Sequence, residues 1–321
     1  FATCKHLAET QPPWLLKESA SSAALHGNLK LLYWFRSAGH KFSMEVYEKA
    51  ALGGHLEVLG WARKGELESP NSICSEAACG GHLEVVQWAR ANGCPWDEWV
   101  CVEAACCGHL KLLQWARANG CPWDEWTCLY AAKGGHLEVL QWLRANGCPW
   151  DEQVSATAAR NGHLELLQWA RESECPWDED ACVHAAIGGH IEILQWLYEM
   201  GCPLYKSVCS QAAAHGHLQV LQWARAKGCV WDEDTCKYAA EGGHMEVLQW
   251  ARANKCPWNE WTCSSAARGG HLEVLQWARA NGCPWDHYTC DNASNYDHFE
   301  LLQWALANGC PWNKPARFDD L

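Results

Sequence analysis

The chain has 321 residues, 49% of them hydrophobic, and a formal net charge of -13 at pH 7. Proteins that track phosphates or bind membrane surfaces need clustered Lys and Arg, so this acidic balance argues against nucleic-acid and membrane-surface binding. No stretch approaches the 18 or more consecutive apolar residues that indicate a membrane-spanning helix, so membrane insertion is not expected.

One short phrase returns every 27 residues along the chain. Its marker position is Asn28 in the first unit and His in the next ten, at 55, 82, 109, 136, 163, 190, 217, 244, 271 and 298. A Trp stands six residues after every marker, from Trp34 to Trp304. Self-similarity at such a period is typical of a solenoid of stacked units. No Pro/Ser/Gly-rich or charged linker breaks the phase.

Residues 1–27 fit the same phase only in part. Phe1 falls on a marker position, Leu7-Ala8 fall on that unit's Trp-Ala, and Pro13-Trp14 resemble its closing Pro-Trp with an offset of one residue. We therefore expect a partial, degenerate N-terminal repeat. We also expect that sequence upstream of Phe1 was processed, truncated or left out, which removes any targeting information.

The segment Asp124–Gly147 is representative of one unit. Asp124 is a good helix N-cap, and a first helix of about nine residues is predicted to run to Gly134-Gly135. His136 opens a second helix that ends at Asn146-Gly147, where Gly can adopt the left-handed conformation. Apolar residues cover over half of this second helix, which indicates neighbours on both sides, as in a stacked array. We expect the Trp of these second helices to be core residues, because they share a face with Leu and Val.

The phrase Ala-Ala-x-Gly-Gly-His-Leu-Glu-Val-Leu-Gln-Trp-x-x-x-Asn-Gly resembles the second half of an ankyrin repeat, and this similarity covers residues 15 to 312. Ankyrin units usually have 33 residues, so about six are absent here from the loop between repeats. The resemblance implies that β-hairpin fingers are missing. We expect the Trp of the Pro-Trp loop, such as Trp123 and Trp177, to pack over the ends of adjacent helices instead.

Seventeen of the 21 Cys occupy only two repeat positions, one in the first helix and one at the start of the loop. If the two sets formed disulfides, a repeat that lacks one Cys should also lack its partner. This is not so, since Cys148 is present although Ser155 occupies the first-helix position that follows it. Equivalent residues of adjacent repeats are expected about 8–10 Å apart. This distance exceeds the roughly 7 Å that can separate the Cα atoms of a disulfide. The pattern favours buried, reduced thiols and an intracellular, reducing compartment, either cytoplasm or nucleus, with an organelle left open. Cys106 and Cys107 lie off this pattern at a turn and are candidates for reactivity, with their redox state open.

Neither a metal site nor an enzyme is predicted. One His per unit at helix spacing cannot place three or four ligands around one ion, so we expect each His to bond turn backbone at the start of the second helix. The sequence contains no phosphate loop, nucleophile elbow, HExxH motif or isolated carboxylate pair. We therefore predict no catalytic residues, no metal ligands and no cofactor.

Variation among the units divides the first helix into two faces. Counted from the N-cap residue, positions 3, 4, 7 and 8 barely change, whereas positions 2, 5, 6 and 9 differ in nearly every unit. Aromatic residues recur at the free positions, and clustered exposed aromatics mark interaction sites. The alternative is that these residues are partly covered packing residues. The resemblance implies that this helix lines the concave surface where partners bind.

Candidate partner-binding residues are taken from these free positions. We expect the strongest aromatic site from Trp99 to Lys133 and a second one at Trp261 and Arg268. The full set is Trp99, Val102, Glu103, Trp126, Leu129, Tyr130, Lys133, Arg160, His184, Lys237, Tyr238, Glu241, Trp261, Arg268 and Tyr288.

The sequence thus predicts an all-α, ankyrin-like solenoid of about eleven 27-residue repeats. Its parts are a partial repeat (1–27), an array of ten full repeats plus a final half repeat (28–312) and a C-terminal tail (313–321). The predicted function is a non-catalytic protein-interaction scaffold whose protein partner is unidentified. A structural subunit of a larger stable assembly and a thiol-rich redox or metal-buffering protein are the alternatives.

Overall fold

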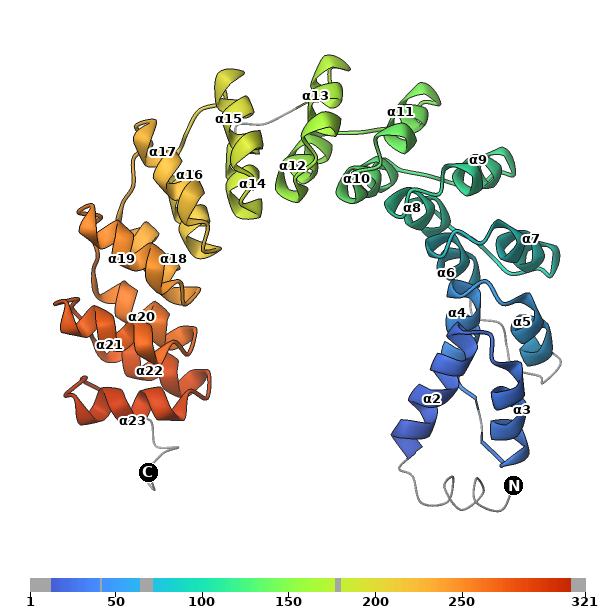
Figure 1. Ribbon diagram of the computed structural model, residues 1–321, viewed down its shortest axis with the longest axis horizontal. Helices are drawn as coiled ribbons and strands as arrows, with labels where there is room; N and C mark the ends of the chain where they lie inside the picture. Colours follow the sequence, from blue (N-terminus) through green and yellow to red (C-terminus); the bar gives the residue numbers. More distant parts are fainter. Residues whose placement is uncertain (1–12, 41, 64–71, 177–179, 313–321) are drawn as a thin grey trace. The chain divides into compact units, whose positions relative to one another are not determined.

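A computed structural model describes residues 13–40, 42–63, 72–176 and 180–312. The start of the partial repeat (1–12), Trp177 and the tail (313–321) lie outside these residues. Within them the protein is all-α, and its helices follow the predicted alternation of first and second helices (Figure 1). None of the helices found there is both long enough and apolar enough to cross a bilayer.

Eleven helix pairs account for the described helices. The first helices are α2 (Pro13–Leu25), α4 (Glu45–Leu52), α6 (Ile73–Cys79), α8 (Trp99–Cys106), α10 (Glu125–Gly134), α12 (Glu152–Asn161), α14 (Ala181–Gly188), α16 (Lys206–Ala214), α18 (Glu233–Glu241), α20 (Glu260–Arg268) and α22 (His287–Asn295). The second helices are α3 (Leu29–Ser37), α5 (Leu56–Arg63), α7 (Leu83–Ala91), α9 (Leu110–Ala118), α11 (Leu137–Ala145), α13 (Leu164–Glu172), α15 (Ile191–Glu199), α17 (Leu218–Ala226), α19 (Met245–Ala253), α21 (Leu272–Ala280) and α23 (Phe299–Ala307).

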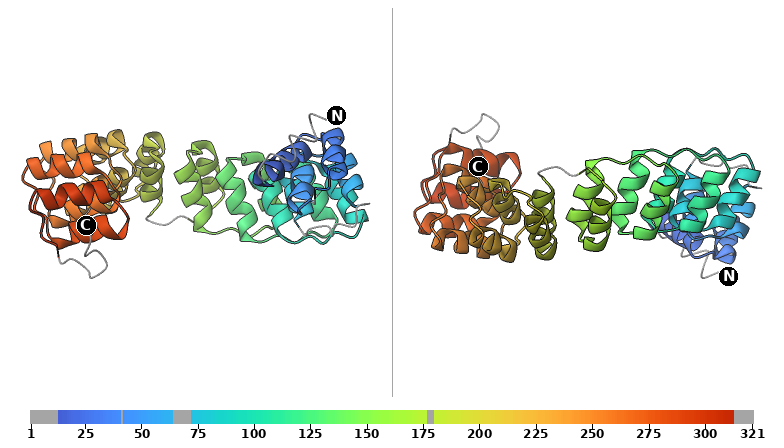
Figure 2. Two further views of the ribbon diagram at one scale, coloured as in Figure 1. Left: turned by 90° about the horizontal axis from the view of Figure 1, so that it is seen from below. Right: turned by 90° about the horizontal axis from the view of Figure 1, so that it is seen from above.

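The chain divides into two compact units. Unit 1 comprises Phe1–Val154 and Gln168–Cys175, and unit 2 comprises Ser155–Leu167 and Pro176–Leu321. In unit 1 the first helices α2, α4, α6, α8 and α10 contact one another in series, and in unit 2 the helices α14 to α22 do the same. Each second helix packs mainly on the first helix of its own pair, so each unit has two rows of helices (Figures 1 and 2).

Small side chains allow the first helices to pack closely. Cys128, Ala131 and Ala132 of α10 are completely buried, and the corresponding residues of the other first helices are buried in the same way. The second helices contribute larger apolar groups, such as Val139, Leu140 and Leu143 of α11. The core of each unit therefore lies between the two rows, as expected for a stack of amphipathic helices.

The helix ends follow the predicted chemistry. Asp124 precedes α10 in an extended conformation, and its backbone N–H donates to Oγ1 of Thr127 at 3.4 Å in a capping box. The side chains of Asp232, Asn259 and Asp286 accept backbone N–H groups in the first turns of their helices. Gly147, after α11, has a φ of +80°, so the prediction of a left-handed glycine there is confirmed.

The marker His joins each repeat to the one before it. Nε2 of His136 donates to the carbonyl oxygen of Cys106, at the end of α8, over 3.0 Å. The same bond, at 2.9–3.1 Å, is made by His55, His82, His109, His190, His217, His244 and His298. Carbonyls at a helix end have no partner within the helix, and the imidazole supplies one. The expected bond to turn backbone is present, but the turn belongs to the preceding repeat.

These His rings explain the glycines that precede them. Gly108 has a φ of +77°, and a Cβ there would lie 2.6 Å from the ring of His136 in the next repeat. Gly134 would place a Cβ 2.3 Å from the carbonyl oxygen of Cys106, which is the oxygen that His136 binds. Glycine is therefore required by the packing of successive turns as well as by backbone conformation.

The loop Trp is held between two repeats. The guanidinium of Arg117 lies 4.2 Å from the ring of Trp123, which in turn meets Trp142 edge to face at 5.8 Å. The same triplets are Arg90–Trp96–Trp115, Arg144–Trp150–Trp169, Arg225–Trp231–Trp250, Arg252–Trp258–Trp277 and Arg279–Trp285–Trp304. Loop Trp therefore rests on the second helix of the following pair.

The second-helix Trp are not core residues, and that prediction was wrong for all but one of them. Trp61 is 8% exposed, whereas Trp88, Trp115, Trp142 and their equivalents are half-buried. Neighbouring second helices make few contacts with one another, and in many repeats the loop Trp packs on the ring of the second-helix Trp. They form an outer aromatic layer instead.

The described cysteines are free thiols, and most are buried. Cys128 lies beside Cys148 of the same repeat, and the hydrogen bond between them together with burial raises the pKa of the Cys128 thiol. Cys148 in turn lies 3.4 Å from the carbonyl oxygen of Asp124, to which its S–H donates. The two Cys sets thus pair within a repeat, twenty residues apart. At the position equivalent to Cys128 in the next repeat stands Ser155, whose Oγ donates to the carbonyl oxygen of Pro176.

Candidate protein-interaction surface

Aromatic rings of the first helices project from the row opposite the second helices. Position 2 of the first helix is exposed because it faces away from the neighbouring helices and from its own second helix. The exposed fractions there are 46% at Trp99, 51% at Trp126, 45% at Trp261 and 44% at Tyr288. Exposed Trp is unusual on a soluble surface without a function, so these positions define the candidate surface.

In unit 1, the first-helix surface is built by α8 and α10. Trp99 of α8 meets Tyr130 of α10 edge to face, with ring centroids 6.2 Å apart. Nζ of Lys133 lies 5.1 Å from the Tyr130 ring, and Trp126 stands exposed at the start of the same helix. The structure therefore brings together the predicted aromatic group from Trp99 to Lys133. We call it the α8–α10 aromatic surface.

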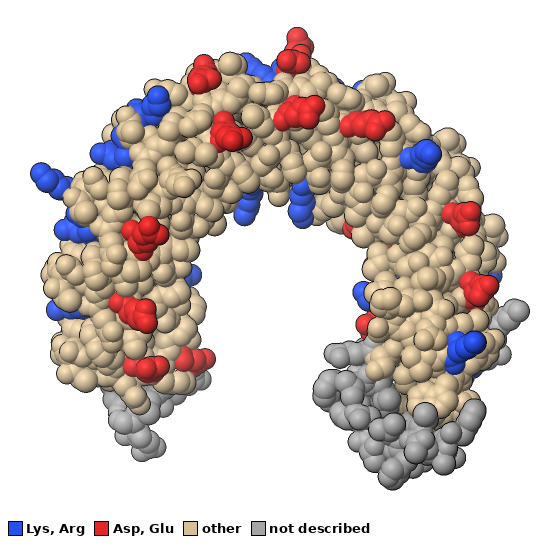
Figure 3. Space-filling model, viewed as in Figure 1, with Lys and Arg blue, Asp and Glu red and all other residues tan. Residues whose placement is uncertain are grey.

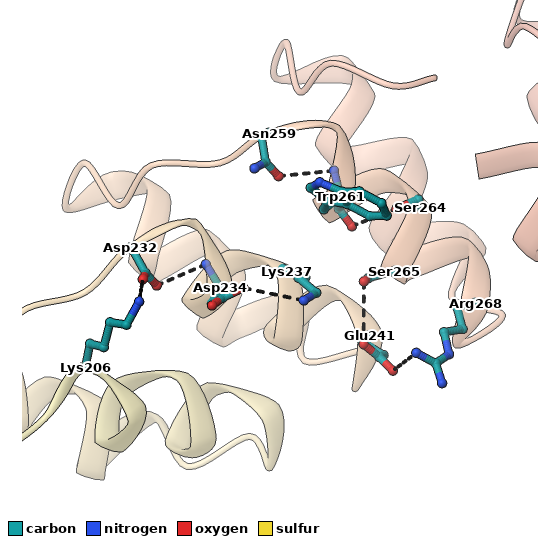
Figure 4. A network of polar contacts seen from close by, with 10 residues as sticks. All are labelled: Lys206, Asp232, Asp234, Lys237, Glu241, Asn259, Trp261, Ser264, Ser265 and Arg268. Atoms are coloured by element: carbon teal, nitrogen blue, oxygen red, sulfur yellow. Dashed lines mark hydrogen bonds and ion pairs between the residues drawn. The ribbon is translucent and has the colours of Figure 1, made fainter. Parts of the chain in front are cut away.

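In unit 2, the first-helix surface is built by α18, α20 and α22. The rings of Trp261 and Tyr288 are stacked, with centroids 5.4 Å apart and an angle of 23° between their planes. Arg268 lies 3.4 Å from a carboxylate oxygen of Glu241, whose other oxygen accepts from Ser265 Oγ at 3.5 Å (Figure 4). We call this group the α18–α22 aromatic surface.

A small hollow adjoins Trp261. Its volume is about 340 Å³, and it is lined by Glu233, Asp234, Lys237, Asn259 and Trp261. Nζ of Lys237 lies 3.4 Å from Asp234 and 4.5 Å from the ring of Tyr238. Figure 4 shows Trp261 and Lys237 on the adjacent first helices α20 and α18. An aromatic wall with carboxylates opposite it suits a cationic or hydrogen-bonding side chain.

Lys206 on α16 extends the polar network toward the loop before α18. Its ammonium lies 2.6 Å from a carboxylate oxygen of Asp232, and this contact raises the pKa of Lys206 (Figure 4). Asp232 also caps α18 by accepting the backbone N–H of Asp234. The Asp232 carboxylate thus contacts Lys206 and caps α18. The acidic groups that line the hollow are Glu233 and Asp234.

Several predicted residues are less accessible than the sequence suggested. Val102 is 1% exposed because position 5 of the first helix faces the next first helix, so it is not part of an accessible surface. Glu103, Leu129, Tyr130, Lys237, Tyr238 and Glu241 are half-buried. His184 is half-buried, and its Nδ1 is buried without a hydrogen-bond partner in the described structure. Arg160, Lys133 and Arg268 are exposed.

Sequence reasoning missed two contributors to the surface. Tyr296 lies in the turn after α22, is exposed, and has the Arg268 guanidinium 5.5 Å from its ring. Lys206 replaces the acidic residue that usually follows the N-cap. Both lie outside the four first-helix positions that vary most. Each differs from the residue that most repeats have at the same position, and this difference could have revealed them from the sequence.

Charge is distributed along the units without forming one patch. The second helices carry an exposed Glu in their first turn in most repeats, such as Glu84, Glu138 and Glu246. On the face seen in Figure 3, Asp and Glu side chains lie at intervals within each unit, separated by uncharged surface.

A family model described as ankyrin repeats (many copies) matches residues 128–171 and 236–279. Each matched segment contains most of a first helix, the glycine turn, a second helix and nearly all of the next helix pair, and the same elements recur through the described chain. By this match the chain contains ankyrin repeats. Ankyrin repeat domains are generally protein–protein interaction modules and typically non-catalytic, and no catalytic family matches this one.

Among solved structures, the crystal structure of the human ASB11 ankyrin repeat domain is similar to this ankyrin repeat protein at 19% sequence identity. The match covers 56% of this chain and 96% of that chain, with a TM-score of 0.43. No curated protein matches the chain.

Proposed function

We propose that this ankyrin repeat protein is a non-catalytic scaffold that binds a protein partner through the exposed face of its first helices. The observation that carries the proposal is the exposure of Trp99, Trp126 and Trp261, because large aromatic rings dominate the binding energy of protein interfaces. The described loop Trp and most second-helix Trp are half-buried, whereas these three rings are 45–51% exposed.

The surroundings of these rings suit a partner with mixed chemistry. The α8–α10 aromatic surface combines apolar rings with the ammonium of Lys133. The α18–α22 aromatic surface combines the stacked pair Trp261 and Tyr288 with the carboxylates of Glu233 and Asp234. Protein interfaces typically have such an aromatic centre with a polar rim. We therefore expect the partner to present apolar side chains together with charged or amide groups.

Affinity purification with the full chain and three variants tests the proposal. We expect proteins retained by the wild type to be lost or strongly depleted with the double variant W99A/W126A and with W261A. The matched control is Phe299→Ala, which removes an exposed aromatic ring from α23, a second helix. Identical retention by all variants would exclude the first-helix face as the binding surface.

A structural subunit of a stable assembly is the second candidate, because a permanent partner would cover the same exposed rings. Mass photometry of the native protein separates the two functions. A scaffold that binds its partner reversibly is expected to be found in part as a free chain of 36.0 kDa, whereas a permanent subunit is found only at the mass of its assembly.

A further inference from the structure

Three cysteines differ from the rest in being accessible. Seventeen of the described Cys are buried, whereas Cys79, Cys106 and Cys107 are half-buried. Cys79 ends α6, Cys106 ends α8, and Cys107 follows directly, so all three lie at the same end of two adjacent first helices in unit 1. Two of them, Cys106 and Cys107, were candidates from the sequence, and Cys79 is brought to them by the stacking of the repeats.

Two of these thiols face each other beside a carboxylate. Sγ of Cys79 lies 3.6 Å from Sγ of Cys107. Glu103, one helical turn before Cys107, completes a group in which the three ligand atoms all lie within 4.8 Å of one another. Within the described residues, this is the group of His, Cys, Asp and Glu side chains with spacing suited to a metal ion.

The position of Cys107 arises from an exception in the turn. Most repeats have glycine there, with φ between -74° and -79° at Gly80, Gly242 and Gly269. At Cys107 φ is -98°, a rotation that accommodates the Cβ where a glycine would otherwise be needed. The backbone on both sides is held, because the carbonyl of Cys79 accepts from His109 and that of Cys106 accepts from His136. The thiols therefore stand on a fixed scaffold.

The sulfur separation distinguishes metal binding from a disulfide. Zn–S bonds of about 2.3 Å at a tetrahedral angle place two thiolate sulfurs about 3.8 Å apart, close to the separation found here. A disulfide instead requires a sulfur–sulfur distance of about 2.05 Å. The structure thus has the spacing of two thiolates that share one cation.

The local charge also favours a cation. The Glu103 carboxylate lies within the same group as the two thiols, so negative charge gathers there once the thiols lose their protons. A divalent cation offsets the same negative charges, and binding displaces the thiol protons.

We propose that Cys79, Cys107 and Glu103 bind one divalent cation of the zinc class, through two thiolate sulfurs and one carboxylate oxygen. Binding releases the two thiol protons to solvent, and no redox change is involved. Three protein ligands leave a fourth tetrahedral position for water or for a donor atom of a bound partner. The site would link α6 to α8, so metal binding also stabilises this part of unit 1.

Cobalt titration of the full, reduced and metal-free chain tests the site. We expect one Co²⁺ per chain to bind with a thiolate-to-cobalt charge-transfer absorption band, and Zn²⁺ to displace it. Cys79→Ser and Cys107→Ser should each weaken binding at least about tenfold, since even losses around a metal's ligands cost about 10–100-fold. Glu103→Gln should weaken it while keeping the sulfur bands. Zn²⁺ should also raise the midpoint of thermal unfolding of the wild type but not of Cys79→Ser.

Cys106→Ser is the matched control, because Cys106 is equally accessible but is not one of the three ligands. This variant should bind Co²⁺ like the wild type, and circular dichroism checks that each variant is folded. The proposal is overturned if the reduced wild-type chain binds no Co²⁺ at one equivalent, or if binding survives Cys79→Ser. A third result would also overturn the proposal: the reduced chain binds no Co²⁺, and glutathione disulfide oxidises two of its thiols. That result would identify a redox pair.

Discussion

Nε2 of His136 lies 3.0 Å from the carbonyl oxygen of Cys106, thirty residues earlier and at the end of the preceding repeat's first helix. Eight of the marker His make this bond, so the imidazole of one repeat completes the hydrogen bonding of the repeat before it. Contact between the repeats of this protein therefore does not rest on apolar packing alone.

Replacement of His136 by Ala should lower the free energy of unfolding by about 1–3 kcal/mol, because the helix-end carbonyl of Cys106 loses its donor in a partly buried position. Urea denaturation followed by circular dichroism measures the change. The control is His26→Ala, since His26 is exposed and its ring bonds only to Ser22 in its own helix. Equal losses for the two variants would mean that the bond between repeats contributes nothing.

Gly108→Ala should destabilise the protein more than Gly120→Ala. Both glycines have positive φ, +77° and +84°, so both substitutions carry the left-handed strain of about 1–2 kcal/mol. Only the Cβ at 108 meets the ring of His136, whereas nothing lies within 4 Å of a Cβ at 120. Overpacking at 108 should add about 1–3 kcal/mol, measured as the difference between the two denaturation midpoints. The same loss at both sites would show that the ring moves aside freely.

Acidic pH should weaken the array through its His residues. Burial lowers the pKa of His217 and of His244 below the ordinary value of 6.5. Because the unfolded chain then binds protons more readily, these residues contribute stability above pH 6.5 that is lost as the pH falls through their lower folded-state pKa values. The urea concentration at the unfolding midpoint should be lower at about pH 5 than at about pH 7.5. This difference should be smaller in H217Q/H244Q. An unchanged pH dependence in that variant would contradict the assignment.

Trp123→Ala and Trp126→Ala should affect different properties. Trp123 is held between Arg117 and Trp142 but is only half-buried, so its loss should cost about 2–3 kcal/mol of stability, less than the roughly 3–5 kcal/mol of a fully buried Trp. Trp126 should change stability by no more than about 0.5 kcal/mol while reducing partner retention. Calorimetry of both variants checks the contrast, and a large loss of stability at Trp126 would identify it as a packing residue.

The period and the helix boundaries could be predicted because they depend on local chemistry. Asp124 as an N-cap, Gly147 as a left-handed stop and the buried Ala131-Ala132 pair are each decided within a few residues of sequence. Repetition then extends a correct interpretation of one unit to all the others. The all-α fold and the family followed from the same residues.

Relationships between repeats could not be predicted in this way. The partner of His136 is thirty residues away, and that of Cys128 is twenty residues away, so neither is visible in a helical wheel. Val102 was placed on the free face because it varies, although variation there reflects adjustment to a neighbouring helix. Cys79 was overlooked because its significance depends on Cys107, which only the stacking of α6 against α8 brings close.

Asp297, with a φ of +60°, stands where the other repeats have the second turn glycine, and no His ring of a later repeat packs against it in the described structure. The need for glycine at that turn therefore depends on whether the next repeat packs a His ring against it. Anyone who lengthens the array by grafting a further repeat after α23 would need to restore glycine at 297. Conversely, a repeat moved from the middle to the end could accept a side chain there. A change in the order of the repeats is therefore expected to alter the stability of the array through these turns.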